Sequence, residues 1–129
     1  MKAHVKSMAS VLMLGAVGIG GGLLAARGYL HLSPAYISGD YSAHRAQARE
    51  RVILLGSTWC GYCAKTRAYL SANAIAFADI DIEQSAFAEQ WLTDLGAEGV
   101  PVILVGDRQI RGFRPEAIAE AVAALPTSP

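Results

Sequence analysis

The chain has 129 residues, of which 53% are hydrophobic, and its 11 Lys and Arg side chains balance 11 Asp and Glu. This length allows one small domain around a single core and leaves no room for a second independent domain. Nucleic-acid binding requires a basic field, which a net charge of zero does not supply, so we expect no nucleic-acid partner.

The N-terminal segment is typical of a sequence directed to a membrane. Residues 8–26 contain no charged side chain, and as a helix they would be about 28 Å long, close to the roughly 30 Å thickness of the hydrocarbon core. Lys2 and Lys6 outweigh Arg27 in positive charge, which predicts a cytoplasmic N-terminus. We therefore predict a single-pass inner-membrane anchor over residues 1–32, with the domain in the periplasm. The alternative is a cleaved signal and a soluble periplasmic protein.

The remainder of the chain divides into three parts. Residues 33–50 contain turn residues and then a short polar stretch, and we interpret them as a polar linker that separates the domain from the membrane. The domain itself is predicted over residues 51–125, followed by a tail at 126–129.

The predicted elements of the domain follow the order β-α-β-α-β-β-α. Hydrophobic patterning predicts a buried strand, a helix, a strand, a helix, a hairpin and a last helix, at residues 51–57, 60–74, 77–82, 85–96, 100–113 and 114–125. The spacing of apolar residues along the helices predicts which side chains face the core: Leu70 and Ala74, then Phe87, Trp91 and Leu95, then Ile118, Val122 and Leu125.

The two cysteines of the chain, Cys60 and Cys63, lie in "WCGYC". A zinc site needs at least three protein ligands, and the histidines all lie upstream of the predicted domain, at positions 4, 31 and 44. We therefore expect no metal. A purely structural disulfide would close so short a loop that it would remove little entropy from the unfolded chain.

A redox pair agrees better with the position of these cysteines. Cys60 follows a buried strand at the start of a predicted helix, where free backbone N–H groups and the helix dipole favour a thiolate. Cys63 lies one turn further along the same face, where it can attack a mixed disulfide formed by Cys60. Lys65 and Arg67 add positive charge nearby, which either supports the thiolate or is simply solvated.

A second feature lies forty residues downstream, where Pro101 enters the apolar strand of "EGVPVIL". A proline at this place is explained by an edge strand or an ordinary turn. Alternatively, a cis Val100-Pro101 bond would expose the backbone of Val100 to an extended peptide or to glutathione.

Together, "WCGYC", "GVP" and the Gly112-Phe113 end of the last strand resemble the glutaredoxins of the thioredoxin superfamily. The resemblance covers approximately residues 51–125. It implies an α/β thioredoxin-like fold with a four-stranded mixed sheet flanked by helices, preceded here by the N-terminal hydrophobic helix. It also implies Cys60 as nucleophile, Cys63 as resolving cysteine and a cis Pro101. The candidate contacts to substrate or glutathione are Trp59, Tyr62, Val100, Pro101, Gly112 and Phe113.

The chain departs from the glutaredoxin pattern after its last predicted strand. Arg111 replaces the first glycine of a Gly-Gly pair, while Arg114 and Pro115 occupy positions that are acidic in the family. These changes weigh against tight glutathione binding. The stretch "GFRPE" looks instead like the glutaredoxin-like electron donors of ribonucleotide reductase, and "CGYC" resembles the active site of bacterial periplasmic disulfide isomerases.

The predicted function is therefore that of a thiol-disulfide oxidoreductase. Its partners would be disulfide-containing proteins or glutathione mixed disulfides, together with an upstream reductant. It would hold no permanent cofactor, with glutathione as a co-substrate. Two alternatives stay open: a glutathione-dependent carrier of a [2Fe-2S] cluster, and a dedicated electron donor to one protein partner that docks through Trp59, Tyr62 and Phe113.

Overall fold

The computed structural model describes residues 34–127, so the predicted anchor over residues 1–32 lies outside the described part of the chain. Within residues 34–127, each helix is too short or too polar to cross a membrane. The folded unit begins at Ala35.

A single mixed sheet forms the centre of this unit, with the strand order β1-β5-β4-β2-β3. The strands are β1 (Ile37–Ser38), β2 (Val52–Gly56), β3 (Ala78–Asp81), β4 (Val102–Val105) and β5 (Arg108–Arg111). β2 pairs with β3 in parallel and with β4 antiparallel, and β5 joins β4 to β1 by antiparallel pairing. The two central strands, β2 and β4, are buried at every position, as the continuous apolar runs of the sequence predict.

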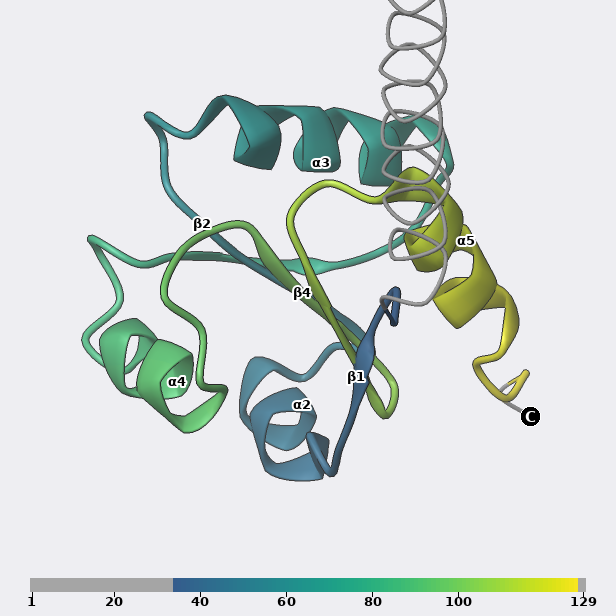
Figure 1. Cartoon of the computed structure of the whole chain (residues 1–129), viewed down its shortest axis with the longest axis horizontal. Helices are drawn as coiled ribbons and strands as arrows, with labels where there is room; N and C mark the ends of the chain where they lie inside the picture. The colour runs from purple at the N-terminus through teal and green to yellow at the C-terminus, as the bar shows by residue number, and fades with distance from the viewer. Residues whose placement is uncertain (1–33, 128–129) are drawn as a thin grey trace, which may run out of the picture. The chain divides into compact units, whose positions relative to one another are not determined.

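Helices cover both faces of the sheet (Figure 1). They are α2 (Ser42–Ala48), α3 (Gly61–Ala72), α4 (Ala88–Asp94) and α5 (Pro115–Ala123). In Figure 1, α3 lies above the sheet and α5 to its right, and α2 and α4 lie below it. The predicted order β-α-β-α-β-β-α is confirmed from β2 onward, because each predicted element has its counterpart in the structure.

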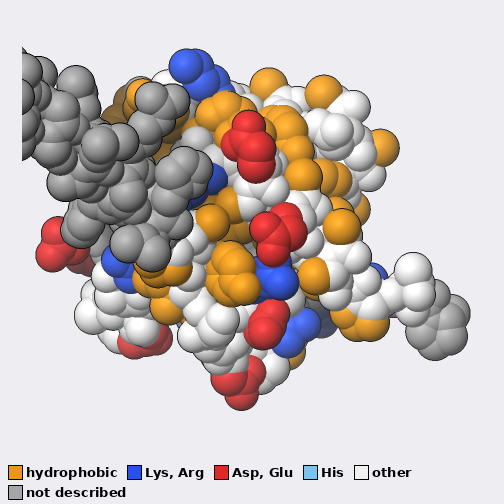
Figure 2. Space-filling model, turned by 45° about the vertical axis from the view of Figure 1, so that its right-hand side comes forward, with side chains coloured by type: hydrophobic (Ala, Val, Ile, Leu, Met, Phe, Trp, Pro, Cys, Tyr) orange, Lys and Arg blue, Asp and Glu red, His pale blue; other side chains and the backbone are white. Residues whose placement is uncertain are grey.

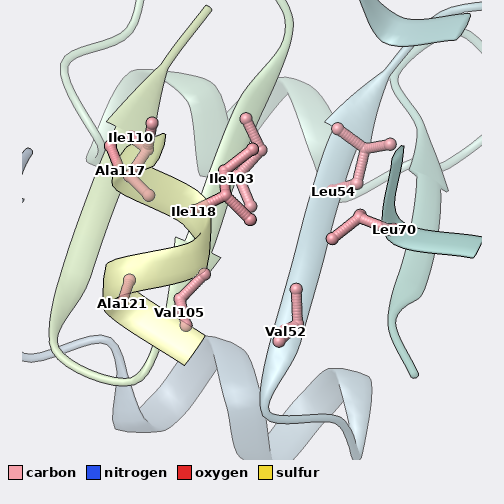
Figure 3. Packing of buried hydrophobic residues seen from close by; sticks show 9 residues of the cluster. All are labelled: Val52, Leu54, Leu70, Ile103, Val105, Ile110, Ala117, Ile118 and Ala121. Carbon is pink, nitrogen blue, oxygen red and sulfur yellow. The ribbon is translucent and has the colours of Figure 1, made fainter. Parts of the chain in front are cut away.

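The alternation of side chains along the strands divides the core into two layers. Val52 and Leu54 of β2 belong to the layer under α3 and α5, whereas Ile53 and Leu55 belong to the layer under α2 and α4. In Figure 3, Ile118 of α5 lies beside Ile103. The first layer consists of Val52, Leu54, Leu70, Ile103, Val105, Ile110, Ala117, Ile118 and Ala121.

The predicted four-stranded sheet has a fifth strand, which comes from the predicted linker. β1 pairs with the free edge of β5, with Ile37 opposite Gln109. α2 follows, and Tyr41, just before it, is only 7% exposed and belongs to the second core layer. From Ala35 onward, the stretch expected to be a spacer is therefore part of the domain. The reason is that an open sheet edge and an uncovered apolar face are both costly in water.

Two side chains expected in the core are exposed. Ala74 lies beyond the end of α3 with a φ of 54°, in the turn that leads to β3. Phe87 caps the start of α4, stays 37% exposed, and packs its ring at a tilt against Trp91, with a centroid distance of 4.9 Å. Both helices are shorter than predicted, so the apolar periodicity at their ends does not correspond to a buried face.

Candidate functional site

Cys60 and Cys63 lie at the N-terminus of α3, directly beyond the buried strand β2. Cys60 is the N-cap residue, with extended backbone angles, and its sulfur accepts a hydrogen bond from the backbone N–H of Cys63 at 3.2 Å. The two cysteines form a disulfide with a Cα–Cα distance of 5.2 Å. When the pair is reduced, the same N–H group and the helix N-terminus favour a negatively charged sulfur at Cys60.

Burial distinguishes the two sulfurs. Cys60 retains 8% exposure, whereas Cys63 is fully buried. A Cβ atom added at Gly56 would lie 3.2 Å from both Cβ and Sγ of Cys63, so the end of β2 packs closely under this cysteine. A substrate from solution can therefore approach Cys60, while Cys63 can react only with Sγ of Cys60, once a substrate sulfur is bonded there.

The loop before β4 lies beside Cys60. The Val100-Pro101 bond is cis, as the resemblance implied. The sulfur of Cys60 lies 3.8 Å from the carbonyl oxygen of Val100. Gly112, with a φ of 75°, donates its N–H to the carbonyl of Pro101 at 2.9 Å. Three predicted site residues from two distant segments are thus brought together beside the nucleophile.

Two predicted aromatic contacts, Trp59 and Tyr62, are strongly exposed on either side of Cys60, at 69% and 61%. The indole N–H of Trp59 donates to a carboxylate oxygen of Glu83 at 3.0 Å. The Nζ atom of Lys65 lies 5.2 Å from the ring centre of Tyr62, a cation–π contact. Large side chains fixed in exposed positions next to a reactive group are suited to contact a partner.

Phe113 is half-buried rather than fully available. Its ring packs edge-to-face against Tyr69 of α3 at a centroid distance of 6.0 Å. The hydroxyl of Tyr69 in turn donates to the carbonyl of Pro115, at the start of α5. The structure therefore ties Phe113 to the helix that carries the cysteines, and only part of its ring faces the solvent.

Arg67 forms a bidentate ion pair with Asp79 of β3, with N···O distances of 2.6 and 3.1 Å. It also donates to the carbonyl of Ser57 at 3.2 Å. The hydrogen bond to Asp79 raises the pKa of Arg67 above its usual value. Its charge is thus largely compensated by Asp79, and its evident role is to bind α3 to the ends of β2 and β3.

An open groove runs from the cis proline along the loop that follows α4. It has a volume of about 450 Å³ and is lined by Gly96, Glu98, Gly99, Val100, Pro101, Arg111 and Gly112. Arg111 uses one guanidinium nitrogen to donate to the carbonyls of Leu95 and Gly96, at 2.9 and 2.8 Å. The residue that departs from the glutaredoxin pattern therefore forms part of the groove wall and also holds the end of α4.

Charged side chains of both signs contact the exposed aromatics of the site, Glu83 at Trp59 and Lys65 at Tyr62. On the face shown in Figure 2, acidic and basic side chains are interspersed with apolar ones. Within residues 34–127, His, Cys, Asp and Glu side chains form no group of three or more that could hold a metal ion.

Comparisons with known proteins agree with this geometry. A glutaredoxin family model matches residues 52–110. The glutaredoxin-like protein NrdH of Lactococcus lactis is 37% identical over 62 residues, which cover 85% of its length and 47% of this chain. The chain belongs to the glutaredoxin family. A glutaredoxin-type protein of Mycobacterium tuberculosis is 34% identical over 53 residues, 40% of this chain, and the chain spans only 63% of that relative.

Solved structures of the family share the fold. The glutaredoxin of Archaeoglobus fulgidus superposes with a TM-score of 0.53 at 23% identity, over 59% of this chain and 89% of that protein. The NrdH-redoxin of Escherichia coli superposes with a TM-score of 0.51 at 23% identity, over 60% of this chain and 99% of that protein. The glutaredoxin fold thus accounts for the part from β2 onward, while β1 and α2 precede the 52–110 match.

Several residues of the site could not be found from the sequence. Glu83 lies in the turn after β3, and nothing in its local sequence connects it with Trp59. In the sequence, Gly56 is simply the last residue of a predicted strand, and only the structure shows how closely Cys63 packs against it. Arg111 was visible as a departure from the family pattern, but its bonds to Leu95 required the fold.

Proposed function

We propose that this protein is a dithiol oxidoreductase that reduces or exchanges disulfide bonds through Cys60 and Cys63. The observation that carries the proposal is the asymmetry of the pair. Cys60 retains 8% exposure and accepts the N–H of Cys63, whereas Cys63 is fully buried within reach of it. An accessible nucleophile and a protected resolving group are what two-step disulfide exchange requires.

The reaction proceeds in two balanced steps. The Cys60 thiolate attacks one sulfur of the substrate disulfide, forms a mixed disulfide and releases the other sulfur as a thiolate. Cys63 then loses its proton and attacks Sγ of Cys60, which closes the intramolecular disulfide and releases the second substrate thiolate. Two electrons pass from the protein to the substrate, and an upstream dithiol returns them by the reverse exchange.

We propose protein disulfides as the preferred substrates, with glutathione mixed disulfides as a slower class. Arg111 occupies the groove wall where the glutaredoxin pattern has a glycine, and the residues Trp59 and Tyr62, close to Cys60 in the chain, carry exposed aromatic rings. Exposed aromatic side chains beside a reactive group favour contact with a polypeptide.

The test compares two substrates under equal conditions. The reduced protein should reduce the disulfides of insulin with a kcat/KM at least about tenfold above that for a small glutathione mixed disulfide, a difference of about 1.4 kcal/mol in transition-state stabilisation. Thiol release is followed by a chromogenic assay. A protein that reacts only with the glutathione mixed disulfide would contradict the substrate class, and one that reacts with neither would contradict the proposed activity.

For location, we propose that residues 1–32 anchor the protein in the inner membrane with the domain in the periplasm. Support comes from the uncharged stretch at residues 8–26 and the preceding lysines. A reporter that is active only in the periplasm, fused after Pro129, is expected to be active. The matched control deletes residues 2–32 and should abolish the signal. Activity of a cytoplasm-specific reporter fused at the same point would contradict this orientation.

A further inference from the structure

A chain of buried hydrogen bonds leads from the N-terminal extension into the sheet. The hydroxyl of Tyr41 donates to Oε1 of Gln109 at 3.1 Å and lies 3.3 Å from the carbonyl of Ile37. Gln109, in β5, is 2% exposed. Its Nε2 donates to the carbonyl of Leu95 at 3.1 Å. Each member of the chain thus orients the next, because a buried amide needs a partner at both its oxygen and its nitrogen.

This series of hydrogen bonds ends at the backbone carbonyl groups that follow α4. Leu95 caps this helix, and Gly96 follows with a φ of 59°. Carbonyls at a helix C-terminus have no partners within the helix. Here they receive Gln109 and Arg111, which lie two residues apart and therefore on the same face of β5.

These carbonyls are also where the wall of the groove begins. The loop from Gly96 to Val100 leaves α4 at this point and lines the groove. Its last residue, Val100, brings its carbonyl oxygen to 3.8 Å from the sulfur of Cys60. The groove wall thus runs from the helix end that Gln109 and Arg111 hold to the residue beside the nucleophile.

We propose that Tyr41 is a positioning residue for the substrate groove, acting through Gln109 and the Leu95 carbonyl on the loop at residues 96–100. The inference rests on the proposed disulfide exchange for its effect on substrate, but not for its effect on the loop. Tyr41 precedes the region matched by the family model, residues 52–110. The extension thus contributes to the substrate site as well as covering the sheet.

Burial and protonation suit Tyr41 to this role. Its ring lies in the core layer under α2 and α4, so the hydroxyl is held in a fixed place. Burial raises the pKa of Tyr41 above its ordinary value, against a smaller lowering by Arg111. The hydroxyl therefore stays a donor throughout the neutral pH range.

The test is Tyr41→Phe, which keeps the ring and removes the donor. The KM for a disulfide substrate should rise roughly three- to tenfold, the range expected for one lost hydrogen bond. The kcat and the alkylation rate of reduced Cys60 should stay within about twofold, because the substitution leaves both cysteines and the Cys63 N–H at the Cys60 sulfur in place. Hydrogen exchange of the amides at residues 96–100 should accelerate, whereas exchange in α3 should not.

Tyr36→Phe is the matched control. Tyr36 lies in the same extension, with the guanidinium of Arg108 at 4.3 Å from its ring centre, and its hydroxyl makes none of the hydrogen bonds found within residues 34–127. Tyr36→Phe should change neither the KM for the disulfide substrate nor the hydrogen exchange of the amides at residues 96–100. Gln109→Met, which removes the middle of the chain, should reproduce the effects of Tyr41→Phe, and the double variant should add little to either, since both act on one network.

The outcomes separate the two proposals. Unchanged exchange at residues 96–100 in Tyr41→Phe and Gln109→Met would overturn the positioning role, whatever the activity. A fall in kcat with constant KM would also overturn it, because that result indicates general destabilisation. If the unmodified protein reduces no disulfide, the proposed function fails, and the exchange measurement still decides whether Tyr41 holds the loop.

Discussion

Cys60→Ser is expected to lower the rate of disulfide reduction by at least about a thousandfold, since loss of a nucleophile removes the whole covalent route. Serine is nearly the same size, and its hydroxyl can still accept the N–H of Cys63 that the sulfur receives at 3.2 Å. The fold should therefore persist while the reaction stops. Reduction of insulin by the pre-reduced variant measures the effect.

Cys63→Ser is the matched variant, and it should fail at a different step. Cys60 can still attack a substrate disulfide, but the buried group that closes the ring is missing. The mixed disulfide should then accumulate as a covalent adduct, visible as a mass increase that disappears on reduction. Residual turnover in Cys60→Ser, or an adduct that forms in Cys60→Ser but not in Cys63→Ser, would contradict the assigned roles.

Ile103→Ala is expected to destabilise the domain by about 2–5 kcal/mol, the usual cost of a large cavity in a core. Ile103 is fully buried in β4 and lies opposite Leu54 on one side and Ile110 on the other. Figure 3 shows it beside Ile118 of α5. Because a domain of this size has a total stability of roughly 5–15 kcal/mol, much of it should be lost. Urea unfolding followed by circular dichroism measures the change.

Ile37→Ala is the control for Ile103→Ala, because it removes the same side-chain atoms from a position that is partly exposed to solvent. Ile37 lies on the edge strand β1 and is 43% exposed. Its replacement should cost less than about 1 kcal/mol. Equal losses at both positions would show that the layer between the sheet and α5 does not carry the stability that its burial indicates.

Much of the site follows from local sequence. The buried run before Cys60 and the short spacing to Cys63 predict a strand, a helix start and a redox pair, because these depend on neighbouring residues only. The approach of Val100 and Pro101 to Cys60 is different. It was available through resemblance to a family, since nothing in the local pattern relates residues forty positions apart.

The extension before residue 51 shows what local sequence patterns fail to predict. Its polar composition and turn residues agree with a spacer, and α2 within it carries no buried residue. Its place in the fold is decided by one backbone contact and one side-chain contact. β1 completes the edge of β5, and Tyr41 enters the core beside Gln109.

By itself, the sequence determined the order of the elements, the buried strands β2 and β4, and the reactive pair, because hydrophobic period and residue spacing act over a few residues. Only the tertiary structure decided which cysteine is accessible, which carbonyls Arg111 and Gln109 hold, and that the extension completes the sheet. These features depend on contacts between segments that are distant in the chain, and such contacts arise from the packing of the whole domain rather than from any local pattern.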